Sequence, residues 1–173
     1  MNRHLVPGAF CILVIMLVGC AGSKTSIMRG QPLDEPVRAI AMAPSGGVLA
    51  DAIAVSLFNQ GFQVFDTNQM SNLLIRLNMT EMELMEPRCL SAVRETGVDV
   101  ILSVKGVAGY DGKPQSASVR LNSTKTGAIV AGVSWQNGWG GQAGSMADRM
   151  QRKDLAEAAD EIAGQVAKNL PRK

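Results

Sequence analysis

The sequence predicts one α/β (α+β) domain: a mixed sheet of about five strands, flanked by helices. Two patterns support this prediction. From residue 37 onward, the sequence has three apolar segments in a row: a short run, a segment of helix length and a second short run. This order is typical of a parallel β-α-β unit with a right-handed crossover. Further along, turn signals separate three apolar or alternating segments, which indicates an antiparallel three-stranded meander.

The parallel unit comprises strand 37–43, helix 48–60 and strand 62–65. The segment 44–47 (Pro-Ser-Gly-Gly) separates the first strand from the helix, and Gly61 ends the helix. The helix is apolar nearly all round, with Leu49, Ala50, Ile53, Ala54, Leu57 and Phe58 spread over adjacent rows. We therefore expect it to be covered on more than one side, and this expectation favours a homo-oligomer.

Two further helices and a strand are expected before the meander. Asp66 and Gln69 have the spacing of a capping box, and the apolar residues Met70, Leu73, Leu74 and Leu77 follow it at helical intervals. The next helix has Pro87 in its first turn and Gly97 just past its end. Residues 99–107 then form a third strand.

The meander begins at the Asp-Gly hairpin signal of residues 111–112. Apolar and polar residues alternate over 117–121, and a second turn leads into residues 128–135. A glycine-rich stretch, 137–144, precedes one final helix that we expect over 146–170. Its charged residues are expected to form a solvated face. They are Arg152, Lys153, Asp154, Glu157, Asp160 and Glu161.

The N-terminal segment predicts a secreted, lipid-anchored protein. The apolar core of residues 9–18 has about half the length of a bilayer span, so residues 1–19 fit a signal peptide. The sequence Leu-Val-Gly-Cys that ends at Cys20 resembles the lipobox of bacterial lipoproteins. This resemblance implies cleavage between Gly19 and Cys20 and acylation of Cys20, and Ala21 after the cysteine implies the periplasmic face of the outer membrane. The alternative is an ordinary signal peptide with an incidental cysteine.

Residues 20–36 are polar and lack an apolar period, so we interpret them as a lipidated tether. Sixteen extended residues reach about 50–60 Å. Residues 37–173 then form a single periplasmic domain, which stays close to the membrane.

Composition argues against several functions. The formal net charge is only +2, which gives no electrostatic reason to expect a nucleic-acid partner. The only histidine, His4, lies in the leader, so the mature chain has no imidazole for acid–base catalysis or for zinc. We therefore expect that the chain is not an enzyme and that it binds no cofactor and no metal. Cys11 also lies in the leader, and Cys89 is expected to be an inert buried thiol.

Two groups of residues are candidate partner contacts. Trp139 is an aromatic residue in the glycine-rich stretch, either an exposed anchor or folded back over the sheet edge. Met79, Met82 and Met85 recur every three residues. They form either a pliable loop that fills the gap between two helices or an apolar surface for a partner. A third interpretation is a site for monovalent copper, but no cysteine or histidine lies among them to support it.

The Pro-Ser-Gly-Gly segment of residues 44–47, with Asp66 about twenty residues later, imitates a dinucleotide-binding fingerprint. The GxGxxG spacing is absent, and Asp66 is better explained as a helix cap. We therefore do not expect a nucleotide.

Several segments together resemble the curli-secretion lipoprotein family (CsgG-like), which is related in fold to the penicillin-binding-protein activator LpoB and to the amino-terminal domain of TolB. They are residues 39–43, 49–51, 61–66, 97–102 and 125–130. The resemblance implies a sheet flanked by helices that serves self-association or partner docking, and it carries over no catalytic residues.

The resemblance implies an outer-membrane lipoprotein that acts as a docking or assembly module of an envelope secretion or surface-structure complex. Family members that build a pore add membrane-crossing hairpins of about 9–11 residues per strand, and this sequence has no spare hairpin. The alternative is an LpoB-like regulator that binds and activates a peptidoglycan synthase.

Overall fold

The computed structural model describes residues 22–138, 142 and 144–171. Its strands are β1 (Lys24–Arg29), β2 (Ala39–Met42), β3 (Gln63–Phe65), β4 (Val100–Ala108), β5 (Pro114–Ser123) and β6 (Ile129–Gln136). Its helices are α2 (Gly47–Asn59), α3 (Thr67–Arg76), α4 (Pro87–Glu95), α5 (Met146–Gln151) and α6 (Leu155–Lys168). Short 3₁₀ turns, η1 (Pro44–Gly46) and η2 (Glu81–Glu83), precede α2 and α4.

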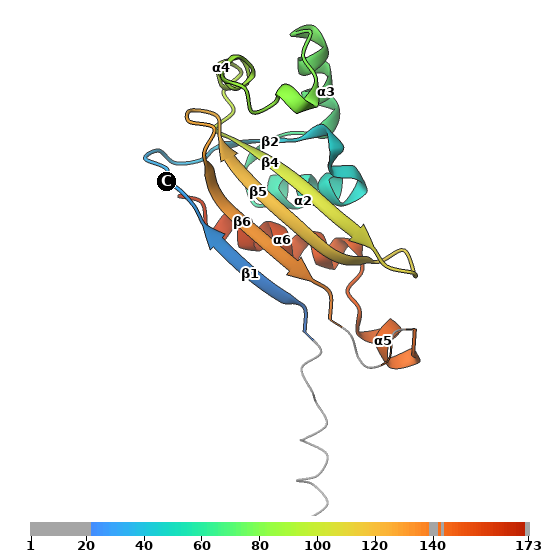
Figure 1. The fold of residues 1–173 in the computed structure, drawn as a ribbon. Coiled ribbons are helices and arrows are strands. Elements are labelled where there is room, and N and C mark those ends of the chain that lie inside the picture. The colour runs from blue at the N-terminus through green and yellow to red at the C-terminus, as the bar shows by residue number, and fades with distance from the viewer. Residues whose placement is uncertain (1–21, 139–141, 143, 172–173) are drawn as a thin grey trace, which may run out of the picture.

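The strands form one mixed sheet in the order β1-β6-β5-β4-β2-β3, as Figure 1 shows. β2 pairs in parallel with β3 and with β4, while β4, β5 and β6 pair antiparallel in succession. The predicted parallel unit and the predicted meander are therefore both confirmed. The capping box between Asp66 and Gln69 at the start of α3 is also present.

The sheet contains a strand that the sequence analysis did not expect. Residues 24–29 fall in the predicted tether, but they form β1, an edge strand antiparallel to β6. Five of its six residues are exposed, so the strand is held by backbone pairing and leaves little apolar period to detect. Part of the predicted tether therefore belongs to the folded domain.

Helices cover the two faces of the sheet unequally. α2 and α6 pack on one face, where the largest fully buried side chains include Trp135, Ile40 and Ile162. α3 and α4 pack over the opposite face, but only against β2 and the start of β4, through residues such as Ala41 and Ile101. Polar side chains of β5 and β6 remain exposed on the rest of that face.

α2 is covered on one side only, which differs from the expectation that it would be covered on several. Leu49, Ile53 and Leu57 are buried against the sheet and α6. Val48, Val55 and Phe58 are 70%, 61% and 66% exposed. These three residues lie on the outer side of the helix, on the same face as the exposed Asp51, so this face of the helix is largely apolar and exposed.

The predicted final helix is divided into α5 and α6. Asp154 interrupts it, because its side chain accepts the backbone N–H of Glu157 and forms a capping box that starts α6. The expected solvated face is also wrong in part, since Arg152 is buried and Glu161 is half-buried. Within the described residues, every helix is too short or too polar to traverse a bilayer.

Candidate functional site

The candidate site is the point where the described chain enters the fold, just before β1. There the carboxylate of Glu161 on α6 accepts hydrogen bonds from the Ser23 hydroxyl and from the Trp135 indole N–H, the latter at 2.9 Å. The Lys153 ammonium lies 2.6 Å from the same carboxylate. A longer contact of 3.4 Å joins Thr25 to its other oxygen. We call Glu161, Ser23, Trp135 and Lys153 the entry clamp.

Local structure fixes each member of the entry clamp. Trp135 points into the core from β6 and is only 1% exposed, so its indole N–H needs a buried acceptor. Lys153 sits in the link between α5 and α6, where its backbone N–H donates to Asn137 at 2.9 Å. Asn137 in turn donates to the Pro114 carbonyl at the start of β5. The entry clamp thus joins β1 to β6 and α6.

Electrostatics favour the charged form of Glu161. Partial burial alone would raise the pKa of Glu161, but hydrogen bonds from Lys153, Ser23 and Trp135 outweigh it and lower the pKa to about 2. The carboxylate therefore stays ionised at any physiological pH. An ionised acceptor also makes stronger hydrogen bonds than a neutral one.

This lowered pKa predicts how the domain responds to acid. Because the folded pKa is about 2 and the ordinary value is 4.5, the clamp contributes its full stabilisation above pH 4.5 and loses it as the pH falls toward 2. The Trp135 indole N–H resonance, assigned with a Trp139→Phe variant, is expected to titrate near pH 2. A titration near pH 4.5 would show that Glu161 is not clamped.

A second network holds the β4–β5 hairpin to α5 at the same end of the molecule. The Arg152 guanidinium lies 3.3 Å from Asp111 and stacks over the Tyr110 ring at 5.3 Å from its centroid. The Tyr110 hydroxyl donates to Asp148 at 2.7 Å. Figure 1 shows α5 and the start of β1 at this end, with α3 and α4 at the opposite end.

Of the site residues predicted from sequence, Gly19, Cys20 and Trp139 lie outside the described residues. The three methionines occupy different environments. Met79 is buried in the core between α3 and α4, whereas Met82 on η2 is 92% exposed and Met85 is 37% exposed.

Cys89 is fully buried in α4, as predicted, and burial raises the pKa of its thiol. The described part of the chain holds no group of three or more His, Cys, Asp or Glu side chains arranged to bind a metal ion. Asp66, which the sequence analysis considered as part of a dinucleotide-binding fingerprint, caps α3.

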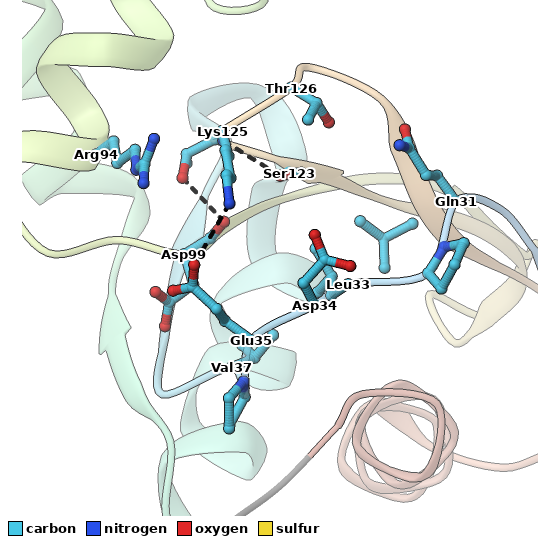
Figure 2. A pocket seen from close by; sticks show the side chains of 14 residues that line it. Gln31, Leu33, Asp34, Glu35, Val37, Arg94, Asp99, Ser123, Lys125 and Thr126 are labelled. Carbon is cyan, nitrogen blue, oxygen red and sulfur yellow. Dashed lines mark hydrogen bonds and ion pairs between the residues drawn. The ribbon is translucent and has the colours of Figure 1, made fainter.

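A small cavity of about 90 Å³ lies beneath the loop of residues 31–37 (Figure 2). Asp99 on its wall accepts two backbone N–H groups around the start of β2, at 2.7 and 3.0 Å. Lys125 reaches Glu35 at 3.4 Å, but both side chains are more than half exposed. The Asp99 carboxylate is already occupied by two backbone N–H groups, and an exposed ion pair such as Lys125–Glu35 contributes little binding energy. The described residues around this cavity therefore offer no set of groups directed at a ligand.

The sequence reasoning missed Glu161 as a functional residue. It placed Glu161 on a solvated face, because the helical pattern there shows only an acidic position beside buried alanines. Two features of the sequence point to this site. Residues 24–29, which form β1, follow closely after Cys20, and Trp135 has an indole N–H that needs an acceptor when it is buried.

No family model matches the chain, and no curated protein matches it. Among solved structures, the chain is similar to a leucine-to-methionine variant of the PelC dodecamer from Paraburkholderia phytofirmans, with 15% identity and a TM-score of 0.50. That match covers 87% of this chain and 99% of PelC, so the two share a fold.

Two further solved structures are similar with lower TM-scores. Lipoprotein GNA1162 from Neisseria meningitidis has 18% identity and a TM-score of 0.46, and covers 76% of this chain and 99% of its own. The LpoB C-terminal domain from Salmonella enterica has 17% identity and a TM-score of 0.42, and covers 61% and 87%. None of the three is a curli-secretion protein, so membership of that family stays a prediction.

Proposed function

We propose that this chain is an outer-membrane lipoprotein anchored through Cys20, which acts without catalysis as a docking and assembly module of an envelope secretion or surface-structure complex. One observation carries the proposal: the lipobox-like sequence ends only three residues before Ser23, and Ser23 is held to the folded domain by Glu161. Three residues extend at most about 11 Å. An acylated Cys20 would therefore hold the domain directly against the lipid.

The surface at this end of the domain supports the same orientation. Tyr110 on the β4–β5 hairpin is 58% exposed, and Met146 and Met150 on α5 are 79% and 80% exposed. An amphipathic aromatic ring and flexible apolar side chains suit the boundary between lipid and water. The hairpin and α5 are fixed to each other through Tyr110 and Asp148, so they would meet the membrane as a unit.

The exposed face of α2 supports one part of the proposal, namely that the chain associates with further copies of itself. Val48, Val55 and Phe58 give this face three large exposed apolar side chains beside the single charge of Asp51, which is more apolar surface than a solvated helix usually presents. PelC from Paraburkholderia phytofirmans, which shares the fold, is a dodecamer. We propose that this chain likewise assembles from several copies.

The runner-up function is an LpoB-like regulator of a peptidoglycan synthase. Such a protein needs a long tether to reach a synthase across the cell wall. The predicted tether of residues 20–36 is interrupted by β1, and only residues 20–23 separate the anchor from the fold. At about 11 Å or less, this link favours a partner that lies at the outer membrane.

Cross-linking in intact cells, followed by purification of the full-length chain, tests the choice between the two functions. We expect recovery of secretion or surface-structure components together with further copies of the chain. Recovery of a penicillin-binding protein as the main product would favour the regulator. A Met82→Ala variant, changed at an exposed position far from the anchor, tests whether the methionine loop contributes to the contact.

A further inference from the structure

The sheet has two open edges at the end that carries the anchor. β2 pairs with β4 only as far as Met42, opposite Leu102. Among the described residues, no strand pairs with the outer edge of β4 beyond Leu102. Gly46 of η1 lies against this edge at Val104, so the open part is residues 105–108, and no strand pairs with the outer edge of β1. Unpaired strand edges are templates for pairing with another chain.

A groove follows the open edge of β4. It has a volume of about 640 Å³ and is lined mainly by apolar side chains. They include Val48, Leu49, Val104, Val107, Pro114 and Leu155. A strand added beside residues 105–108 would direct every second side chain into this groove, because side chains alternate between the faces of a sheet.

β1 has the side chains that such a strand requires. Ile27 lies opposite Val133 and so belongs to the core-facing side of the sheet, yet it is 42% exposed because no strand lies beyond it. Met28 lies opposite Gly132 on the other side and is 58% exposed. An added β1 would therefore place Ile27 in the groove and Met28 on the outer face.

We propose that β1 of one copy pairs antiparallel with residues 105–108 of β4 in the next copy, so that the sheets of successive copies join head to tail and Ile27 enters the groove. The interface is heterologous, because two different edges of the chain meet. The proposal rests on the lipid-anchored, self-associating function proposed above. It assigns self-association to the two sheet edges, with Val48 of α2 lining the groove.

Strand direction makes this pairing compatible with one flat membrane. β1 leaves the anchor end and β4 runs toward it, so β1 and β4 of two upright copies are antiparallel to each other. Every copy therefore keeps its N-terminus on the same side. The other simple arrangement, antiparallel pairing of two β1 strands about a twofold axis, would point the two anchors in opposite directions.

Cysteine cross-linking of the full-length chain in its own membrane tests the proposal. Ser26, Ser134, Ser118 and Lys105 share one row across the sheet, on its outer face. The Ser26→Cys/Lys105→Cys double variant samples the unshifted register, and Met28→Cys/Lys105→Cys and Lys24→Cys/Lys105→Cys sample the registers shifted by two residues in either direction. Within one copy, β1 and β4 are three strand spacings apart, about 14 Å, which is too far for a disulfide.

Mild oxidation is expected to give a ladder of dimers, trimers and larger products from at least one double variant, and no ladder from the single variants. Cys89 does not interfere, because it is fully buried. Two results would overturn the proposal. One is a dimer from Met28→Cys or Ser26→Cys alone, which means that two β1 strands pair. The other is the absence of cross-linked product in all three registers.

A charge at the interface supplies the matched control. Ile27→Lys, combined with the cross-linking pair, places an ammonium in the groove and is expected to reduce the ladder about tenfold or more. Ile75→Lys on α3, a position that is 73% exposed and far from both edges, is expected to leave it unchanged. An intact ladder in the Ile27→Lys chain contradicts the proposed fit.

The cross-linking and anchoring results can be separated. If the chain sediments with membranes and carries label at Cys20 but forms no ladder, the pairing is wrong and the anchoring stands. If the chain is found unacylated in the soluble fraction, the proposed function is wrong, whatever the cross-links show.

Discussion

Replacing Cys20 by serine is expected to reduce palmitate labelling of the chain to background. A serine hydroxyl cannot form the thioether that links a diacylglyceryl group to a lipoprotein cysteine, and each acyl methylene contributes about 0.8 kcal/mol to membrane binding. Without the acyl chains, the remaining membrane attachment is through the leader, whose apolar core is only about half a bilayer span. Labelling with radioactive palmitate, with sedimentation of the membranes, measures both effects.

Cys89→Ala is the matched control for this experiment. Cys89 is buried in α4, so its thiol is not accessible to an acyl transferase, and the variant is expected to keep full labelling. Label that persists in the Cys20→Ser chain, or that disappears in the Cys89→Ala chain, contradicts the predicted anchor.

Replacing Glu161 by alanine is expected to destabilise the domain by about 2–4 kcal/mol. The change leaves the buried indole N–H of Trp135 without its acceptor and leaves the Lys153 ammonium without its partner. It also releases the Ser23 hydroxyl, so the start of β1 loses its side-chain attachment to α6. The midpoint of urea unfolding, measured at pH 7, gives the change in stability.

Two further variants make the Glu161 result specific. Asp160→Ala changes an exposed carboxylate on the same helix and is expected to alter stability by no more than about 0.5 kcal/mol. Glu161→Gln keeps an acceptor for Trp135 but removes the charge, so its effect should fall between the two. An unchanged unfolding midpoint for Glu161→Ala would show that β1 is held by backbone pairing alone.

The parts of the fold that follow from the sequence are those in which local pattern and packing agree. The parallel unit has strands bounded by glycine and proline and a helix with an apolar period, and the capping box of Asp66 and Gln69 marks the start of α3. The meander has turn signals between alternating residues. In each of these segments, burial of the apolar residues requires the structure that the spacing predicts.

The parts that do not follow depend on contacts between distant segments. β1 has almost no buried side chain, so its strand structure comes from the free edge of β6 rather than from its own pattern. The break between α5 and α6 comes from Asp154, which caps the start of α6. The sequence pattern does not reveal this break, because the apolar residues on both sides of Asp154 fit one continuous helix.

The candidate site divides in the same way. Cys20 is predicted from a contiguous motif, because lipidation is read from a short linear segment. The entry clamp is assembled from residues more than a hundred positions apart, Ser23 and Glu161, and no local spacing identifies it. Ser23 follows Cys20 by only three residues in the sequence, which connects the predicted anchor to the entry clamp.

Mass spectrometry of the N-terminal peptide of the mature chain, purified from membranes, tests the central claim most directly. We expect a peptide that begins at residue 20 and carries a diacylglyceryl group on the Cys20 sulfur, with or without a further acyl chain on its amine. A peptide that begins at residue 20 or earlier with an unmodified thiol would contradict the account, because nothing would then hold the domain beside the lipid.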